Sequence, residues 1–190
     1  MKQLDVMLDL ETLDTAPTAV ILSITAVPFN INNGEIYVDD IYSESVDIDS
    51  SLKRGFTIKG STFTWWLMQS KEAREIVCKG QEHAHDIEFI IDDFSIWYDS
   101  LKNKYGENIY IWGNGSDFDV ATLRNAYNVI LGHEPPFDFR KIQDLRTMVR
   151  LAPEIKENMK FEGIEHNPID DCKHQIKYLT KIYSEKFLKI

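Results

Sequence analysis

The stretch VMLDLET at residues 6–12 constrains the fold more than any other part of the chain. It is an apolar run that ends in two acids, Asp9 and Glu11. Side chains in a strand alternate between its two faces, so residues two apart share a surface. We therefore expect a buried strand over residues 3–9 that presents both carboxylates side by side at its end. Two carboxylates at that spacing repel each other unless one is protonated or a cation lies between them.

Length and composition indicate a single globular domain over residues 1–190. The chain has 190 residues, of which 43% are hydrophobic and 27% are charged, values typical of a folded soluble domain. Its apolar runs are too short to span a bilayer and no signal-peptide pattern opens it, so we expect no membrane association. Cys78 and Cys172 have no metal-ligand spacing and suit reduced thiols in a cytoplasm, although a disulfide between them stays open.

The net charge of −10 limits the nucleic-acid partners that the chain can hold. Proteins that grip long stretches of phosphate backbone without sequence preference are normally basic. Either nucleic acid is not the partner, or the contact is short and carried by metal ions.

Hydrophobic periodicity predicts strands first and helices later. Besides the first strand, we expect strands over residues 19–30, 35–46 and 108–113, with an Asn-Asn-Gly turn at residues 32–34. The first three strands should be antiparallel neighbours. Helices are expected at residues 61–77, 86–101, 116–130, 140–152 and from Asn167, which with Pro168 suits a helix start. This order indicates an α/β fold in which helices pack against a mixed sheet.

Acidic residues stand at the ends of three expected elements, and one histidine precedes the last of them: Asp9 and Glu11, then Asp117 and Asp119, then His166 with Asp170 and Asp171. Carboxylates that converge without cysteine favour a hard cation such as Mg²⁺ or Mn²⁺. Four of them can hold two ions, which clamp the attacking and leaving oxygens of a phosphoryl displacement. A histidine nearby can take the proton of the attacking water.

Each of these residues also has a structural interpretation. A pair of acids at a strand end is equally typical of a solvated turn. Asp117 and Asp170 fit acids that stabilise a helix N-terminus through its dipole, and His166 alone fits a capping or surface histidine. The ordered combination is what indicates a site.

That combination resembles the DnaQ-like exonucleases, and among them the DEDDh subgroup. The shared pattern is Asp-x-Glu on the first strand, Phe-Asp after a strand in mid-chain and His-x4-Asp near the C-terminus. Longer segments look like the catalytic domain of exodeoxyribonuclease VIII, related phage exonucleases and the RNase AS ribonucleases: DLETLDTAPTAVILSITAV, TFTWWLMQSKEAR, IWGNGSDFD, DLRTMV and FEGIEHNPIDDCKHQIKYL. The resemblance implies an RNase H-like fold, a mixed five-stranded sheet with helices on both faces.

The resemblance also assigns site residues. It implies that two Mg²⁺ or Mn²⁺ ions are bound by Asp9, Glu11, Asp119 and Asp171, with His166 as general base. Asp119 is preferred to its neighbour two positions earlier because the family's acid follows a Phe. Asp171 is preferred to the acid before it because only Asp171 keeps the four-residue gap from His166. The chain departs from the pattern at position 168, where a proline replaces the small residue usual in relatives.

Seven side chains are candidates for contact with a nucleic-acid end: Leu10, Thr12, Leu13, Phe118, Trp66, Gln69 and Arg146. Trp65 and Trp66 can stack on bases, but aromatic residues at helical spacing are more often core, and we expect at least one to be core. A structural hydrogen bond or salt bridge is an equal alternative for Gln69, Arg74 and Arg146.

The function implied by the resemblance is a metal-dependent 3′–5′ exonuclease that releases nucleoside 5′-monophosphates, with DNA expected ahead of RNA. Exodeoxyribonuclease VIII works in the opposite direction on duplex DNA, so the resemblance leaves the polarity open. The alternatives are an exoribonuclease that trims RNA tails, a noncatalytic nucleic-acid-binding domain of the same fold and an acidic interaction module. A homo-oligomer and a cytoplasmic location, in a bacterium or a phage-infected cell, are also expected.

Overall fold

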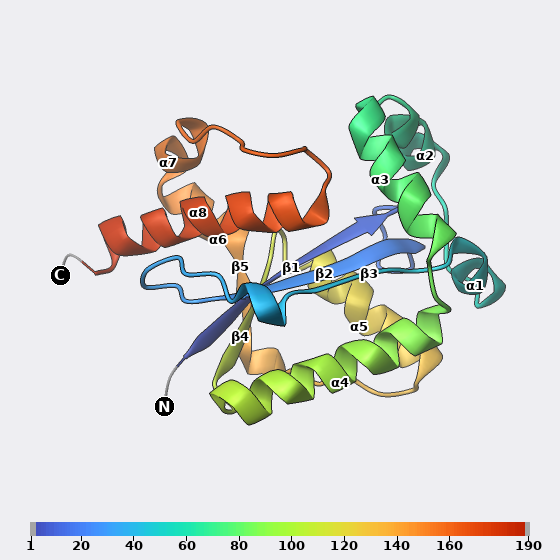
Figure 1. The fold of residues 1–190 in the computed structure, drawn as a ribbon, viewed down its shortest axis with the longest axis horizontal. Coiled ribbons are helices and arrows are strands. Elements are labelled where there is room, and N and C mark those ends of the chain that lie inside the picture. Colours follow the sequence, from blue (N-terminus) through green and yellow to red (C-terminus); the bar gives the residue numbers. More distant parts are fainter. Residues whose placement is uncertain (1–2, 189–190) are drawn as a thin grey trace.

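The computed structural model describes residues 3–188 and shows one mixed sheet of five strands in the order β3-β2-β1-β4-β5 (Figure 1). β1 pairs antiparallel with β2, which pairs antiparallel with β3, while β1 and β4 and then β4 and β5 are parallel. The α/β prediction is thereby confirmed, as is the antiparallel arrangement of the first three strands. The strands are β1 Leu4–Thr12, β2 Ile21–Phe29, β3 Tyr42–Ser45, β4 Ile109–Gly113 and β5 Ile142–Asp144.

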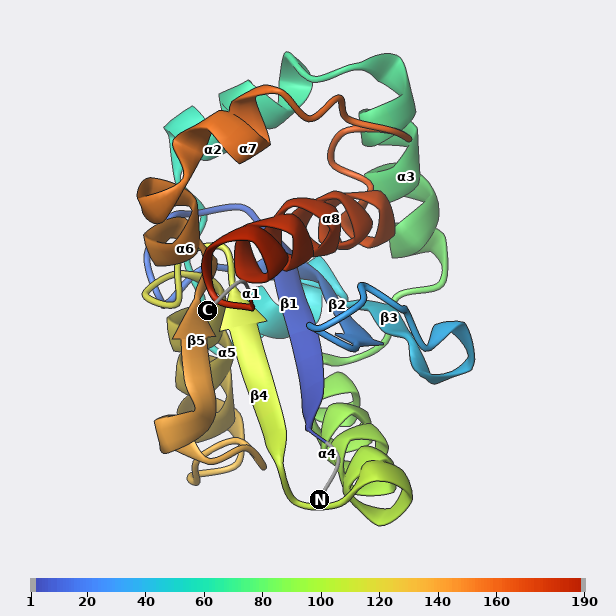
Figure 2. The same ribbon diagram turned by 90° about the vertical axis from the view of Figure 1, so that its left-hand side faces the viewer.

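Helices cover both faces of the sheet (Figures 1 and 2). α4 and α5 pack on one face, whereas α6 and α8 pack on the other. The period of two along β1 explains the two layers, because Val6 and Leu8 join one apolar core and Met7, between them, joins the other. The helices are α1 Ile48–Lys53, α2 Gly60–Leu67, α3 Lys71–Glu82, α4 Ile87–Tyr105, α5 Asp119–Ile130, α6 Leu145–Leu151, α7 Pro153–Glu157 and α8 Pro168–Lys186.

The two long helices begin where the sequence predicts. The Asp86 side chain accepts a hydrogen bond from the Glu88 amide at the start of α4. The Asn167 side chain accepts from Ile169 and Asp170 at the start of α8, with Pro168 in the first turn. Pro168 therefore fits the helix start despite its departure from the family pattern.

The segment at residues 60–82 differs from the prediction of one continuous helix. α2 ends at Leu67 and α3 begins at Lys71, because the Ser70 side chain accepts a hydrogen bond from the Ala73 amide and caps a new helix. α2 itself begins at Gly60 without a side-chain cap.

The prediction for residues 140–152 was wrong over its first half. Residues 139–141 form a 3-10 turn, and the next three residues form β5, which pairs with β4 from Ile111 and Ile142 onward. The helix α6 begins only at Leu145, capped by Asp144. Three residues are too few for a period of two to be visible in the sequence.

The third strand is shorter than predicted. Residues 35–46 give a single bridge at Ile36, a 3-10 turn at Val38–Asp40 and only then β3. Asp40 binds the side chains of Lys104 and Tyr105, so the turn is tied to α4 instead of continuing the strand.

The structure also bears on the two cysteines and on membrane-spanning helices. Cys78 and Cys172 are both free thiols. Across residues 3–188, no helix is long and apolar enough to cross a membrane.

Candidate active site

Four carboxylates and one imidazole from separate segments meet at the C-terminal end of β1. Asp9 and Glu11 come from β1, Asp119 opens α5 directly after β4, and Asp171 lies in the first turn of α8. Together with His166 they line one cavity of about 240 Å³, which we call the acidic cavity. The structure therefore brings all five predicted residues together.

Asp119 is the most buried member, with 3% of its surface exposed. Its Oδ1 accepts a hydrogen bond from the Leu10 amide at 3.2 Å, which ties the start of α5 to β1. Its Oδ2 is buried and has no hydrogen-bond partner. Gly113, the last residue of β4, lies next to it, since a Cβ built there would be 3.5 Å from Asp119 Oδ2, an ordinary contact distance. Burial raises the pKa of Asp119 to about 7, opposed by backbone hydrogen bonds and by the charge of Arg146.

Asp9 and Glu11 lie on the same face of β1, as alternation along the strand requires. Burial, and then the charges of Asp119 and Asp171, raise the pKa of Asp9 well above its ordinary value. The pKa of Glu11 is raised in the same way, by burial and then by Asp9. Ionisation of either group is therefore unfavourable unless a positive charge lies close to it.

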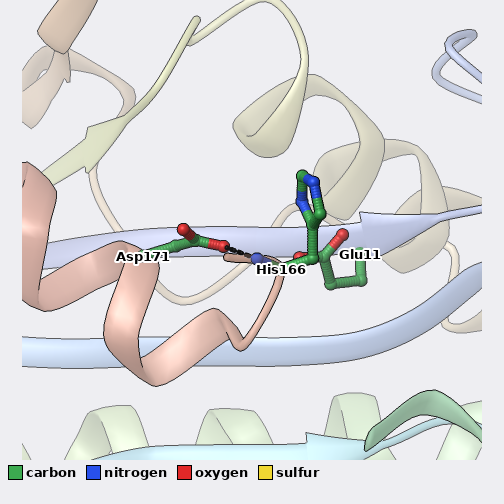
Figure 3. Close-up of side chains that lie close together, drawn as sticks. All are labelled: Glu11, His166 and Asp171. Carbon is green, nitrogen blue, oxygen red and sulfur yellow. Dashed lines mark hydrogen bonds between the residues drawn. The ribbon is translucent and has the colours of Figure 1, made fainter. Parts of the chain in front are cut away.

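His166 and Asp171 are joined through the backbone (Figure 3). The His166 amide donates to Asp171 Oδ2 at 2.9 Å, a bond that partly offsets the effect of burial, which raises the Asp171 pKa to about 6. Burial lowers the pKa of His166, so its imidazole is neutral at neutral pH. One ring nitrogen of His166 lies within 4.8 Å of carboxylate oxygens of both Glu11 and Asp171.

The donor set fits a hard divalent cation. Within residues 3–188 no lysine or arginine forms an ion pair with any of the four carboxylates. The unpartnered Asp119 Oδ2 and the raised pKa values are what a site built for a cation shows in its absence. All four donors are carboxylate oxygens, the ligands that Mg²⁺ and Mn²⁺ prefer.

The neighbouring acids lie outside this cluster. Asp117 is exposed. Asp170 accepts a hydrogen bond from the Ile164 amide at 3.1 Å and so shapes the loop before α8. Asp170, in the first turn of α8, fits its structural interpretation, whereas Asp117 lies two residues before α5 and outside the first turn of that helix.

A second cavity, of about 390 Å³, adjoins the acidic cavity and is lined by three aromatic side chains, Trp65, Trp66 and Phe118; we call it the aromatic cavity. Leu10 and Thr12, two of the predicted contact residues, also line it. Trp66 is 7% exposed and belongs to the core, as expected of at least one of the two tryptophans. Trp65 is 43% exposed.

The remaining candidates divide between the site and the scaffold. Arg146 lines the acidic cavity. Leu13 is wrongly predicted as a contact, because its amide pairs with Val20 and its side chain is buried in the core. Gln69, in the break between α2 and α3, donates to the Trp65 carbonyl, and the Arg74 guanidinium donates to the Leu67 carbonyl. Neither side chain lines either cavity.

Gln175 is a site residue that the sequence reasoning missed. Its Nε2 donates to Asp9 Oδ1 at 3.0 Å and its side chain lines the acidic cavity. The signal was its position four residues after Asp171, which places both on one face of a helix. Gln175 fixes the orientation of Asp9, as a hydrogen-bonding neighbour of a metal ligand does.

The fold is that of the RNase H-like exonucleases. Solved structures with the same fold include E. coli exonuclease I in complex with a dT13 oligonucleotide (TM-score 0.67, 11% identity, 98% of this chain and 43% of that chain). The S. pombe Pop2p structure with Mg²⁺ and Mn²⁺ bound is similar at TM-score 0.65 and 12% identity, over 96% of this chain and 84% of that one. Cell-death related nuclease 4 (CRN-4) is similar at TM-score 0.58 and 12% identity, over 97% of this chain and 64% of that chain.

The family follows from the sequence match. Residues 4–183 match the model of the 3′-5′ exoribonuclease Rv2179c-like domain, so the chain belongs to the Rv2179c-like family. No curated protein sequence matches the chain. The chain spans 64% of CRN-4 and 43% of exonuclease I, so the activities of those whole proteins do not carry over to it.

Proposed function

We propose that this chain is a two-metal-ion 3′–5′ exoribonuclease of the DEDDh type. The observation that carries the proposal is the convergence of Asp9, Glu11, Asp119 and Asp171 from three distant segments without an ion-pair partner among the described residues. A noncatalytic domain of this fold needs none of these carboxylates, and an acidic interaction module does not need them to converge. The family description, which names an exoribonuclease, favours RNA over the DNA that we expected from the motifs.

The four carboxylates are the proposed ligands of two Mg²⁺ or Mn²⁺ ions, which supply Lewis acidity at the scissile phosphate when bound. Neutral His166 takes a proton from the attacking water. The water oxygen forms a bond to phosphorus while the bond from phosphorus to the 3′-oxygen of the preceding nucleotide breaks. The leaving 3′-oxygen takes a proton from solvent, so the products are a nucleoside 5′-monophosphate and a chain with a new 3′-hydroxyl.

In this proposal the protein contacts only one or two nucleotides of the substrate. The aromatic cavity, with Trp66 and Phe118 in its wall, has the size and lining to take one base. Arg146 is the one lysine or arginine that lines the acidic cavity among the described residues, and it offers a guanidinium to a phosphate. A contact of one or two nucleotides is compatible with a chain of net charge −10, since a long electrostatic track is not needed.

The test is hydrolysis of matched single-stranded RNA and DNA oligonucleotides labelled at the 5′ end. With Mn²⁺ we expect a ladder that shortens from the 3′ end and free nucleoside 5′-monophosphates, faster with RNA, and no products with EDTA. Immediate release of the label as a mononucleotide, without a ladder, would replace the proposed polarity with that of exodeoxyribonuclease VIII. Faster cleavage of DNA would restore the DNA assignment, and no cleavage of either would leave a noncatalytic domain.

Within the fold we assign the chain to the group of exodeoxyribonuclease VIII, phage exonucleases and RNase AS, on the motifs they share with it. We further propose that residues 1–190 act as one cytoplasmic domain. Nucleic acid is the proposed partner, and homo-oligomerisation is a matter for sizing of the purified protein.

A further inference from the structure

His166 is held in an unusual backbone conformation by contacts from outside its own loop. Among the described residues it is the one non-glycine position with a positive φ, 66°, a region that side chains with a Cβ adopt only when their surroundings enforce it. Its amide is fixed by Asp171, but no hydrogen bond from a described residue reaches either ring nitrogen. The direction of the imidazole is therefore set by packing.

The packing comes from two consecutive tryptophans of α2. The rings of Trp65 and His166 meet edge-on, with centroids 4.9 Å apart and planes at 74°. Trp66 lies 5.8 Å from the same ring at 71°, and the two indoles contact each other at 5.2 Å. Edge-to-face pairs at these distances are attractive and have a defined geometry.

The tryptophans are themselves tied to the end of β1. Trp66 Nε1 donates to the Thr12 carbonyl at 2.9 Å, and the Lys59 amide at the start of α2 donates to the Leu13 carbonyl at 2.9 Å. Thr12 directly follows Glu11 in the strand. The strand that carries the first two carboxylates and the imidazole that faces them are therefore linked through α2.

From this arrangement we infer that Trp65 is a positioning residue that holds the His166 imidazole toward Glu11 and Asp171, with Trp66 as its fixed support. The inference rests on the proposed function, in which His166 accepts a proton. Trp66 is buried and hydrogen-bonded, so it is part of the scaffold. Trp65 is 43% exposed, so its replacement removes the contact with His166 without opening the core.

The kinetic test compares Trp65→Ala, Trp65→Phe and a control, Phe63→Ala. Phe63 lies in the same helix, is 49% exposed and makes no ring contact with His166. We expect Trp65→Ala to lower kcat by roughly 10- to 100-fold, since a displacement of about 1 Å can cost 10²-fold, with KM changed less than about twofold. Trp65→Phe should recover most of kcat, and the control should match the wild type.

A double-mutant cycle separates positioning from direct contact with a base. If Trp65 acts through His166, Trp65→Ala in a His166→Ala background should change kcat less than about twofold. A full additive loss in that background would overturn the inference and make Trp65 a substrate contact, as would a loss confined to KM. Thermal unfolding of each variant identifies any loss that comes from the fold alone.

A measurement without substrate keeps the inference distinct from the proposed function. The ring resonances of His166, assigned in NMR spectra by their loss in His166→Ala, should shift in Trp65→Ala and stay in place in Phe63→Ala. Unchanged His166 resonances in Trp65→Ala would overturn the inference whatever the activity. Shifted resonances in a protein that hydrolyses neither RNA nor DNA would instead overturn the proposed function and leave the contact standing.

Discussion

The two ends of β1 carry acids on the same face of the strand, but these acids differ in exposure and in hydrogen-bond partners. Asp5 is buried, whereas Asp9 and Glu11 are half-buried. At the N-terminal end, Asp5 is 1% exposed and accepts hydrogen bonds from Trp112 Nε1 at 2.8 Å and from Gln3. At the C-terminal end, Asp9 accepts one bond, from Gln175, and Glu11 accepts none from a described side chain. Asp5 has no other acid facing it, whereas Asp9 and Glu11 face Asp119 and Asp171.

This contrast separates a structural buried acid from a functional one. A carboxylate buried for structure is supplied with donors from its own scaffold, because a bare buried acceptor is costly. A carboxylate that accepts few hydrogen bonds and lies beside other carboxylates has oxygen lone pairs available to coordinate a ligand. The number of donors, the identity of the neighbours and the exposure of the side chains all distinguish the two ends of β1.

The largest effect should follow from Asp119→Asn, which removes one charge from the carboxylate cluster at the C-terminal end of β1. We expect hydrolysis to fall by about 10²–10³-fold or more, as for loss of a key electrostatic group. Because the pKa of Asp119 is raised to about 7, its stabilising effect is complete below its ordinary pKa of 3.8 and is lost as the pH rises through 7. The metal-free variant should therefore melt at or above the wild-type temperature at pH 8.

Activity assays and thermal unfolding at pH 8 check this prediction. The control is Asp117→Asn, which changes an exposed acid two residues away and should keep wild-type activity. A sharp drop in the melting temperature of Asp119→Asn would show that this acid is structural, and the contrast between the ends of β1 would break.

The next largest effect should come from His166→Ala, which tests whether metal binding and proton transfer are carried by different residues at the C-terminal end of β1. Loss of a general base should lower kcat by roughly 10²–10⁴-fold. Mn²⁺ affinity, measured by calorimetry, should stay almost unchanged because the four carboxylates remain. His133→Ala, a change at an exposed histidine, serves as the control. Weakened Mn²⁺ binding would instead make His166 a ligand or a support for Asp171.

Asp5→Asn tests the opposite end of the strand. Burial raises the pKa of Asp5 from 3.8 to about 6, so its contribution to stability is full below pH 3.8 and is lost as the pH rises through 6. The shift corresponds to about 3 kcal/mol at pH 8. Asp5→Asn should therefore raise the free energy of unfolding at pH 8 by up to that amount and leave it unchanged near pH 3, with hydrolysis unaffected.

Urea unfolding at both pH values measures this effect, with Asp39→Asn as an exposed control. Destabilisation of Asp5→Asn at pH 8 would mean that the hydrogen bonds from Trp112 and Gln3 outweigh burial. The two ends would then differ even more than the pKa values indicate.

The smallest effect should come from Arg146→Gln in the wall of the acidic cavity. An exposed guanidinium that contacts a phosphate contributes modestly, so we expect KM for RNA to rise a few-fold to about tenfold and to depend less on salt. Arg150→Gln, in the same helix and also exposed, should leave KM unchanged. Equal KM values for both variants would exclude Arg146 from the substrate contacts.

The sequence predicted those parts of the fold whose pattern is long enough to repeat. β1 shows its alternation over nine residues and α8 its apolar face over nineteen, and both were located correctly. The three residues of β5 and the break at Ser70 were not predicted, because strand pairing and a single cap decide them. Neither leaves a periodic trace.

The same distinction applies to the candidate site. The carboxylates could be located because each follows or opens an element that the sequence reveals. The spacing of Gln175 from Asp171 shows only that they share a helix face, and its contact with Asp9, like that of Trp65 with His166, depends on how α8 and α2 approach β1. Leu13 was misassigned for the same reason, since proximity to Glu11 in the sequence does not show which side of the sheet a side chain faces.

The bond between Gln175 and Asp9 joins residues 166 positions apart, and it has a consequence for biosynthesis. A chain that grows from its N-terminus displays Asp9 and Glu11 well before His166 and Asp171 are made. Long-range contacts of this kind close late in folding. A nascent chain that ends before His166 therefore lacks two of the five site residues, and under the proposed function the transcript being translated meets a complete site only after α8 has docked.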